Sequence, residues 1–375
     1  MIIVLCYLSM LVLGFSDNLR GPLFFEILKS YGVSDSFGAL IFSGSSVCGF
    51  FTSLLSIRLL KRLTLNHLLS LSLFLFAVSL FGISQSHEFW LALCFFGLMG
   101  ASMGFMGVAQ NSLVSLTSEK IRVRAMSGLH AMYGLASLLA PLMVGIGLQN
   151  GWHWSQFFQI AACLPLVLFI SSFFWVKKRK LKVETDNSHP PPKLKFNTSV
   201  AWACGLLASY VIAEILVASR LSLYSIREFN ITSSEASRFV TGFFVGLLSG
   251  RLLGAFIKWP GVFQTQLFVS LLSSFVFTAL GLYMSPWYFI LTGFAMSVFY
   301  PVCSSFLAEK FKGQEGFIFS YATAAQAISI VVMQSIVGWI SDQHGIRYAM
   351  HLTFVFILIS LVCLWRLSFD RHKKT

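Results

Sequence analysis

The stretch KKRKLKVETDNSHPPPKLKFNT, residues 177–198, is the one sizeable polar segment in a chain of 375 residues. Six long apolar spans precede it and six follow it. An apolar run of roughly 20 residues is long enough to cross the hydrocarbon core of a bilayer as a helix. The sequence therefore predicts an all-α integral membrane protein with 12 transmembrane helices. Its parts would be a six-helix bundle over 1–176, a basic linker over 177–198 and a second six-helix bundle over 199–375.

The composition agrees with a membrane protein. Hydrophobic residues make up 56% of the chain and charged residues 11%, whereas a soluble domain carries about 25% charged residues. The apolar runs are long and unbroken, which favours helices, because a β-barrel would show segments of about ten residues with alternating polarity. The predicted spans lie near 2–28, 36–60, 64–84, 88–117, 122–149, 154–176, 199–227, 234–257, 262–284, 286–311, 315–341 and 345–368.

The basic residues are distributed unevenly between the two sides of the predicted membrane. Of the 27 Lys and Arg residues, 20 lie in segments on the side of the linker and of both termini, and 3 lie on the opposite side: Lys29, Arg227 and Arg347. Cytoplasmic loops carry such an excess. We therefore predict a multi-pass plasma-membrane protein, in the inner membrane if the source is a bacterium, with both termini cytoplasmic. The same distribution explains the net charge of +13 without nucleic-acid binding.

The two halves of the chain resemble each other. A shift of 198 residues places the second span over the eighth, and a slightly smaller shift places Val144-Gly145 near Val337-Gly338. The pairs matched by the first shift include Val33 with Ile231, Ser34 with Thr232, Ser43 with Thr241, Gly44 with Gly242 and Val47 with Val245. A duplicated six-helix unit predicts a substrate site at the interface of the repeats, near the middle of the bilayer.

Several short motifs carry a resemblance to a known family. Between the second and third spans the chain reads SLLSIRLLKR, residues 53–62, and the eighth span contains Gly250-Arg251-Leu252-Leu253-Gly254. Phe299-Tyr300-Pro301 and Ala109-Gln110-Asn111 lie in the tenth and fourth spans. With these motifs the whole chain resembles the major facilitator superfamily, and most of all its fucose-permease-like sugar/proton symporters. The resemblance implies the major facilitator fold, two pseudo-symmetric six-helix bundles.

The chain also departs from that branch. The family's loop signature between the second and third spans has an acidic residue and glycines that are absent from residues 53–62. Gly107 stands where fucose permease has a glutamate, and Gly21 stands near the place of its first-span aspartate, with Asp17 one turn earlier. The family's proton-binding residues are therefore not carried over to these positions.

Charged residues within the spans are the first candidates for function, because a charge at the membrane centre costs about 2.5–3.5 kcal/mol on insertion scales. These residues are Asp17, Arg20, Glu214, Arg220 and Arg251. Asp17 and Arg20 share a helix face, which predicts a binding or gating pair. Glu214 has no cation one turn away on its own helix, so we predict that Glu214 binds and releases the coupling proton unless another helix supplies an arginine. Structural ion pairs between helices, or snorkelling to the surface, are the alternatives for the arginines.

Polar side chains in the spans form the second group of candidates. Amides and phenols both donate and accept hydrogen bonds, as a hydroxyl-rich ligand requires. Hydrogen bonds between helices would explain the same residues. The group consists of Asn18, Asn111, His130, Tyr133, Tyr210, Tyr300, Gln326 and Gln334.

Glycines at 97, 100, 104 and 107 recur along one face of the fourth span. This spacing is typical of a face on which two helices pack closely. The seven cysteines show no spacing that suggests a metal site or a disulfide framework,. No phosphate loop or nucleophile triad is present in the sequence, so we expect neither an enzyme nor a bound cofactor or metal.

The sequence thus predicts a secondary transporter that works by alternating access, as a monomer embedded in the lipid bilayer. The leading expectation is proton symport of a small polar, sugar-like solute. Proton-linked efflux of an amphipathic compound is the alternative, favoured by 39 Phe residues. A nutrient sensor built on a transporter fold is a further possibility, with little cytoplasmic sequence for a signalling module.

Overall fold

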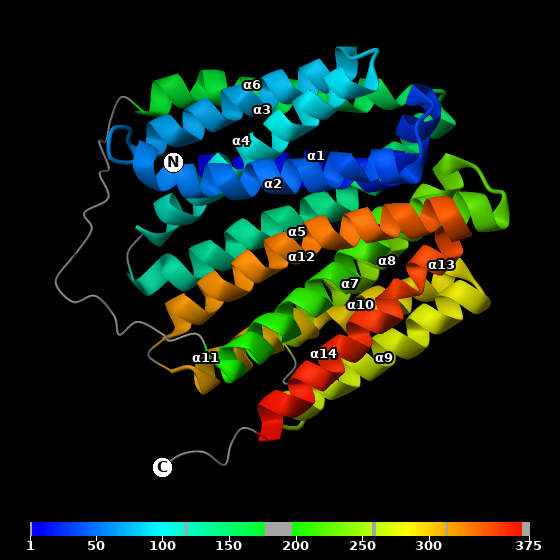
Figure 1. The fold of residues 1–375 in the computed structure, drawn as a ribbon. Coiled ribbons are helices and arrows are strands. Elements are labelled where there is room, and N and C mark those ends of the chain that lie inside the picture. Colours follow the sequence, from blue (N-terminus) through cyan, green and yellow to red (C-terminus); the bar gives the residue numbers. More distant parts are fainter. Residues whose placement is uncertain (1, 117–118, 177–196, 257–259, 313, 370–375) are drawn as a thin grey trace. The chain divides into compact units, whose positions relative to one another are not determined.

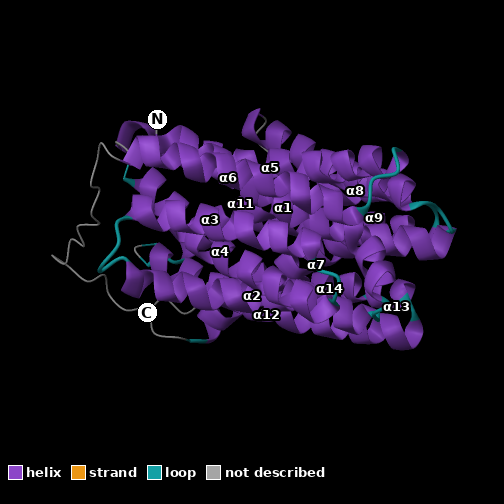
Figure 2. Ribbon diagram, turned by 90° about the horizontal axis from the view of Figure 1, so that it is seen from above, coloured by secondary structure: helices purple, strands orange, loops and turns teal. Residues whose placement is uncertain are grey.

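The computed structural model describes residues 2–116, 119–176, 197–256, 260–312 and 314–369 (Figure 1). Within these residues every regular element is helical and none is a strand (Figure 2). The chain forms two compact units, one within residues 1–185 and the other within 186–375. The predicted linker, 177–198, lies outside the described residues except for Asn197 and Thr198.

The first unit contains six long helices. They are α1 (Ile2–Tyr31), α2 (Asp35–Leu59), α3 (Leu65–Gln85), α4 (Phe89–Ser115), α5 (Glu119–Gln149) and α6 (Trp154–Val176). The second unit has more elements because two of its predicted spans are divided. They are α7 (Thr198–Phe229), α8 (Ser233–Phe256), α9 (Phe263–Tyr283), the short 3₁₀ helix η1 (Pro286–Tyr288), α10 (Phe289–Ser297), α11 (Phe299–Lys310), α12 (Glu315–His344), α13 (Ile346–Met350) and α14 (Leu352–Phe369).

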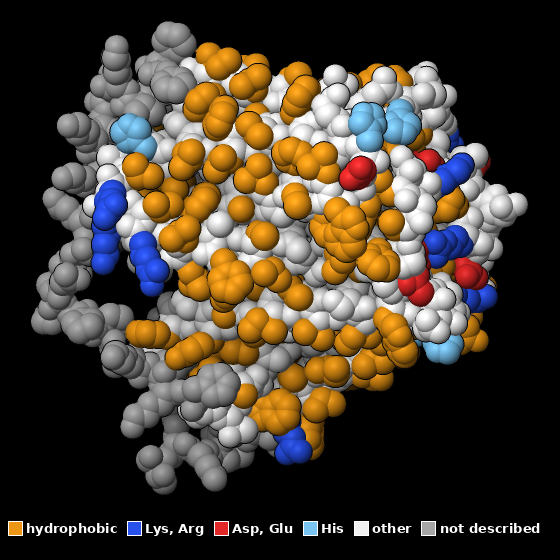
Figure 3. All heavy atoms as spheres, turned by 45° about the horizontal axis from the view of Figure 1, so that its top comes forward, with side chains coloured by type: hydrophobic (Ala, Val, Ile, Leu, Met, Phe, Trp, Pro, Cys, Tyr) orange, Lys and Arg blue, Asp and Glu red, His pale blue; other side chains and the backbone are white. Residues whose placement is uncertain are grey.

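Eleven stretches in the described residues are long and apolar enough to cross a membrane. Each predicted span except the eighth is among them. The eighth, α8, is the twelfth long helical segment, and Arg238 and Arg251 lower its hydropathy. On the face drawn in Figure 3, apolar side chains cover much of the surface, and most of the visible charged side chains lie toward its two ends. This distribution suits helices that lie in lipid.

The predicted tenth span is interrupted between α10 and α11, at Val298. Pro301 explains the interruption, because proline has no N–H to bond the carbonyl of Ser297, four residues earlier. The predicted twelfth span is also divided, into α13 and α14.

The two units use the same helix contacts. In the first unit α1 packs on α5, α2 on α4 and α3 on α6; in the second, α7 packs on α12, α8 on α10 and α9 on α14. These pairs occupy equivalent positions in the two repeats. The shared arrangement is what a duplicated six-helix unit would give.

Glycines allow the closest of these contacts in both units. A Cβ atom on Gly100 would collide with the backbone of Ser45, and one on Gly104 would collide with Gly49. In the second unit, a Cβ on Gly246 would meet the carbonyl of Ile290. The predicted close-packing face of α4 is therefore confirmed at its centre. It is wrong at Gly107, because no neighbouring atom lies within 4 Å of an added Cβ there.

A tyrosine ties the first helix of each unit to the third. Tyr31 on α1 donates its hydroxyl proton to the carbonyl of Ser86, which follows α3, at 2.9 Å. Tyr224 on α7 donates in the same way to the carbonyl of Leu282 on α9, at 2.8 Å. Each tyrosine ring also meets a phenylalanine edge to face, Phe89 in the first unit and Phe289 in the second.

The residues matched by the shift of 198 also begin equivalent helices. The Ser34 hydroxyl accepts a hydrogen bond from the Phe37 N–H at the start of α2. Before α8, the Thr232 hydroxyl accepts from the Glu235 N–H at 3.2 Å, and the Glu235 carboxylate accepts from the Thr232 N–H at 3.0 Å. This reciprocal pair is a capping box, which satisfies two backbone donors of the first turn.

Replacing Thr232 with alanine is expected to lower the free energy of unfolding by ~1 kcal/mol, because the Glu235 N–H loses its acceptor. Denaturant unfolding of the purified protein in detergent measures this change. Thr232→Ser keeps the hydroxyl and should unfold like the unaltered protein. Equal stability of Thr232→Ala and Thr232→Ser would show that the cap contributes nothing here.

Candidate functional site

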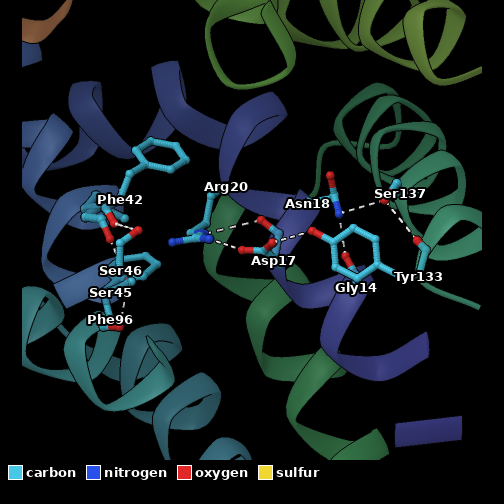
Figure 4. Close-up of polar contacts among 11 residues, drawn as sticks. Gly14, Asp17, Asn18, Arg20, Phe42, Ser45, Ser46, Phe96, Tyr133 and Ser137 are labelled. Atoms are coloured by element: carbon cyan, nitrogen blue, oxygen red, sulfur yellow. Dashed lines mark hydrogen bonds and ion pairs between the residues drawn. The ribbon is translucent and has the colours of Figure 1, made fainter. Parts of the chain in front are cut away.

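Asp17 is the centre of a polar group inside the first unit (Figure 4). Its carboxylate accepts from the Arg20 guanidinium, one turn along α1, and from the Tyr133 hydroxyl on α5 at 2.6 Å. Arg20 Nε also lies 3.3 Å from the Asp17 carbonyl oxygen. The structure therefore brings together three of the residues predicted from the sequence, two from α1 and one from α5.

The Arg20 side chain is 8% exposed and extends from Asp17 toward α2. Its Cζ atom lies 5.1 Å from the centroid of the Phe42 ring, which is within the range of a cation–π contact,. Its Nη1 atom is buried and has no hydrogen-bond partner among the described residues. The guanidinium is thus partly neutralised by Asp17 and keeps one donor for another acceptor.

Asn18 belongs to the same group. Its Nδ2 donates to the Gly14 carbonyl at 2.8 Å and lies 3.0 Å from the Ser137 hydroxyl on α5 (Figure 4). Gly14 makes room for this approach, since a Cβ there would lie 3.0 Å from Tyr133 and Ala136 atoms. Ser137 and Gly14 were not predicted as site residues. Their signal in the sequence is the spacing of four from Tyr133 and from Asn18.

Glu214 is the centre of a second polar group, inside the second unit. The Tyr210 hydroxyl, one turn earlier on α7, lies 2.5 Å from Glu214 Oε2. It also lies 2.6 Å from the carbonyl oxygen of Met296, near the end of α10. Arg251 Nη2 on α8 is 3.5 Å from Glu214 Oε1. The prediction for Glu214 depended on the absence of an arginine from another helix, and Arg251 on α8 is such an arginine.

The Tyr210 side chain is held from several directions. It is 1% exposed. Its ring stacks on that of Phe299, the first residue of α11, with centroids 4.0 Å apart and planes 16° apart. The hydroxyl and the ring thus contact both sides of the interruption between α10 and α11. Phe299 belongs to the motif Phe299-Tyr300-Pro301 and was not predicted as a site residue.

Arg220 and Gln334 form a buried contact between α7 and α12. Arg220 Nη2 donates to Gln334 Oε1 at 2.6 Å, and the two residues are 1% and 0% exposed. Gln334 Nε2 is buried without a hydrogen-bond partner among the described residues. This contact is a hydrogen bond between two helices, which is the alternative explanation given above for polar residues in the spans.

The hydrogen bonds described above do not include the remaining predicted residues, although Tyr300 lies close enough to Glu214 and Arg251 to interact with them electrostatically. Asn111 donates to the Gly107 carbonyl at 2.8 Å, within its own helix. His130 is exposed on α5. Neither Tyr300, 42% exposed, nor Gln326 has a hydrogen bond to another described residue. The described residues contain no group of three or more His, Cys, Asp or Glu that could hold a metal ion.

The two polar groups share a composition: a carboxylate, a tyrosine hydroxyl and an arginine. In the first unit the arginine lies on the same helix as the acid and the tyrosine on another. In the second unit the tyrosine lies on the same helix as the acid, and the arginine lies on another helix. A carboxylate beside a guanidinium is a charge pair that costs less to bury than either ion alone. Each group can therefore hold or exchange a proton, or bind a polar ligand, in an apolar surrounding.

The sequence profile of the Major Facilitator Superfamily matches residues 6–290 and 228–375. The protein TsgA homolog of Yersinia pestis is 20% identical over 259 residues, which cover 65% of this chain. The protein TsgA homolog of Yersinia pseudotuberculosis is also 20% identical over 259 residues. The chain spans 63% of the length of these relatives.

Solved transporters have the same fold. The D-xylose–proton symporter superimposes with a TM-score of 0.77 at 13% identity, over 98% of this chain and 96% of the symporter. A bacterial homolog of the human lysosomal transporter Spinster, inward-facing and unoccupied, superimposes with a TM-score of 0.75 at 14% identity and the same coverage. Twelve long helical segments in two similar units and a profile match along nearly the whole chain lead to one assignment. The chain belongs to the major facilitator superfamily.

Proposed function

We propose that this protein takes up a small polar, sugar-like solute together with a proton, by alternating access. Glu214 is the residue that binds and releases the proton. Asp17 and Arg20 are the charged pair that contacts the solute or gates its passage. The proposal is supported by the different hydrogen bonding of the two acids.

The contacts of the Tyr210 hydroxyl carry the proposal. Its oxygen lies 2.5 Å from Glu214 Oε2 and 2.6 Å from the Met296 carbonyl oxygen. Both separations are those of O–H···O hydrogen bonds, and a phenol has one proton to donate. A protonated Glu214 carboxyl supplies the second proton. It donates to Tyr210, and Tyr210 donates to Met296.

Asp17 needs no such proton. Its carboxylate oxygens accept from Tyr133 and from Arg20, so the ionised form satisfies every contact,. An acid that stays ionised suits binding or gating. An acid that can donate a proton to a neighbouring phenol suits coupling.

Arg251 gives Glu214 a stable state after the proton leaves. The separation of 3.5 Å between Arg251 Nη2 and Glu214 Oε1 is longer than most charge-assisted hydrogen bonds,. An ionised Glu214 would need a partner, because an uncompensated charge away from water is costly. Arg251 is that partner, and the Tyr210 proton would then be shared with the carboxylate.

The solute class is inferred from the polar side chains near the two acids. Asn18, Tyr133 and Arg20 place amide, phenol and guanidinium groups in the first unit, and these donate to or accept from hydroxyl groups,. The D-xylose–proton symporter, with the same fold, is consistent with a sugar-like solute.

The test uses proteoliposomes that contain a pH-sensitive dye. A panel of sugars and other polyols is added outside, followed by a panel of amphipathic drugs. Acidification of the interior on adding one sugar is the expected result. A pH change with drugs alone would favour proton-linked efflux. Uptake of radiolabelled sugar with no pH change would remove proton coupling from the proposal.

The orientation follows the distribution of basic residues. We place both termini in the cytoplasm, and we expect the protein to work as a monomer. A periplasmic alkaline phosphatase fused to the C-terminus should be inactive, and activity of that fusion would reverse the orientation. The detergent-purified protein should have the mass of one chain in light scattering.

A further inference from the structure

An arginine at the end of α14 lies between two tryptophan rings. The Arg366 Cζ atom is 4.9 Å from the ring centroid of Trp365 and 5.9 Å from that of Trp202 on α7. Among the described residues, no hydrogen bond or ion pair of Arg366 is found. The guanidinium is held by ring contacts, and its N–H groups remain available to an anion.

A stripe of exposed apolar side chains leads along α14 to this arginine. Val355, Leu358, Val362 and Trp365 are spaced by three, four and three residues, so they lie on one face of the helix,. They are 46%, 50%, 51% and 54% exposed. The stripe is about ten residues long, or about 15 Å at the rise of an α-helix. It offers an apolar surface that continues directly into a cationic group.

The negative end of the α14 dipole is also covered. Lys310, at the end of α11, donates from Nζ to the carbonyl oxygen of Leu367 at 2.6 Å. The last carbonyls of a helix carry a partial negative charge that would repel an anion. With a second cation on one of these carbonyls, an anion at Arg366 meets less repulsion.

We propose that Arg366, Trp202 and Trp365 form a binding site for an anionic phospholipid. The headgroup phosphate pairs with the Arg366 guanidinium, whose planar N–H groups match phosphate oxygens. One acyl chain lies along the stripe formed by Val355, Leu358, Val362 and Trp365. The stripe distinguishes a lipid from a free phosphate, which would have no use for it. Tryptophan is also enriched at the level of the headgroups.

Native mass spectrometry of the purified protein tests this site. The protein in detergent is titrated with phosphatidylglycerol and, separately, with phosphatidylcholine, and bound lipid is counted. The unaltered protein should bind phosphatidylglycerol more tightly. Arg366→Gln should weaken phosphatidylglycerol binding about fivefold, the change that corresponds to ~1 kcal/mol per basic residue at a membrane surface. Arg366→Lys keeps the charge and loses the planar group. Its affinity for phosphatidylglycerol should lie between those of the unaltered protein and Arg366→Gln.

Arg58 on α2 provides the matched control, because it is exposed and has no cation–π contact with a described ring. Arg58→Gln removes the same charge and should leave phosphatidylglycerol binding unchanged. Equal weakening in Arg58→Gln and Arg366→Gln would overturn the site, as would equal binding of the two lipids. Displacement of phosphatidylglycerol by inorganic phosphate would assign the site to a free anion instead. Because binding is measured without transport, the result is independent of the proposed proton coupling.

Discussion

Glu214→Gln is expected to abolish proton movement coupled to solute uptake while leaving solute binding close to that of the unaltered protein. The glutamine amide is almost the same size as a protonated carboxyl group. Its N–H can donate to Tyr210, so Tyr210 still donates to the Met296 carbonyl,. What is lost is the exchangeable proton. Solute should therefore equilibrate across the membrane in the variant without accumulating.

The measurement is internal pH together with uptake of labelled solute in the same proteoliposomes, with a pH gradient imposed. Asp17→Asn is the matched control, because it changes the other acid by the same chemistry. It should weaken solute binding, since the contact with Arg20 loses its charge, and each solute molecule that enters should still carry a proton. Unchanged proton flux in Glu214→Gln would falsify the role given to Glu214.

Gly100→Val is expected to prevent the first unit from packing. A Cβ at this position would collide with the Ser45 backbone, which cannot move out of the way as a side chain can. Overpacking of a close contact costs about 1–3 kcal/mol and occasionally more, and here α2 and α4 would have to separate. We expect a loss at the upper end of this range, about 3 kcal/mol, with little protein recovered as a single species in size-exclusion chromatography.

Gly107→Val is the control for the same substitution on the same helix. No atom lies within 4 Å of a Cβ at Gly107, so the added side chain meets open space. The intrinsic helix propensities change equally at the two positions, which leaves the α2–α4 contact as the difference. Recovery of Gly100→Val and Gly107→Val in equal amounts would contradict the close-packing account.

Much of the fold could be predicted because lipid imposes simple demands on sequence. Apolar length predicted the spans, and the repeat between Ser34 and Thr232 marked the starts of two equivalent helices. The divided tenth span was not predicted, although Pro301 was already part of a recognised motif. Proline four residues after Ser297 is sufficient to remove one backbone hydrogen bond, and the rule could have been applied from the sequence alone.

The candidate site was predicted less completely, for a physical reason. Local spacing identifies neighbours on one helix, so Asp17 with Arg20, and Tyr210 with Glu214, are visible in the sequence. Contacts between helices depend on register and crossing angle, which spacing does not contain. The Met296 carbonyl is 86 residues from Tyr210 in sequence, and Arg251 reaches Glu214 from another helix. Backbone acceptors such as Met296 also leave no signature in residue identity.

Tyr31, at the end of α1, and Tyr224, in the last two turns of α7, have a consequence for motion. In the first unit the Tyr31 hydroxyl donates to the Ser86 carbonyl, just after α3. In the second unit the Tyr224 hydroxyl donates to the Leu282 carbonyl, near the end of α9. Helix ends are where fraying begins, and a carbonyl already bonded inside the protein gives water less opportunity to enter. Each unit should therefore hold its shape through the transport cycle. Amides near Ser86 and Leu282 should exchange with solvent as slowly as those of the helix interiors, and the microsecond-to-millisecond movements of the cycle should occur in the connections instead.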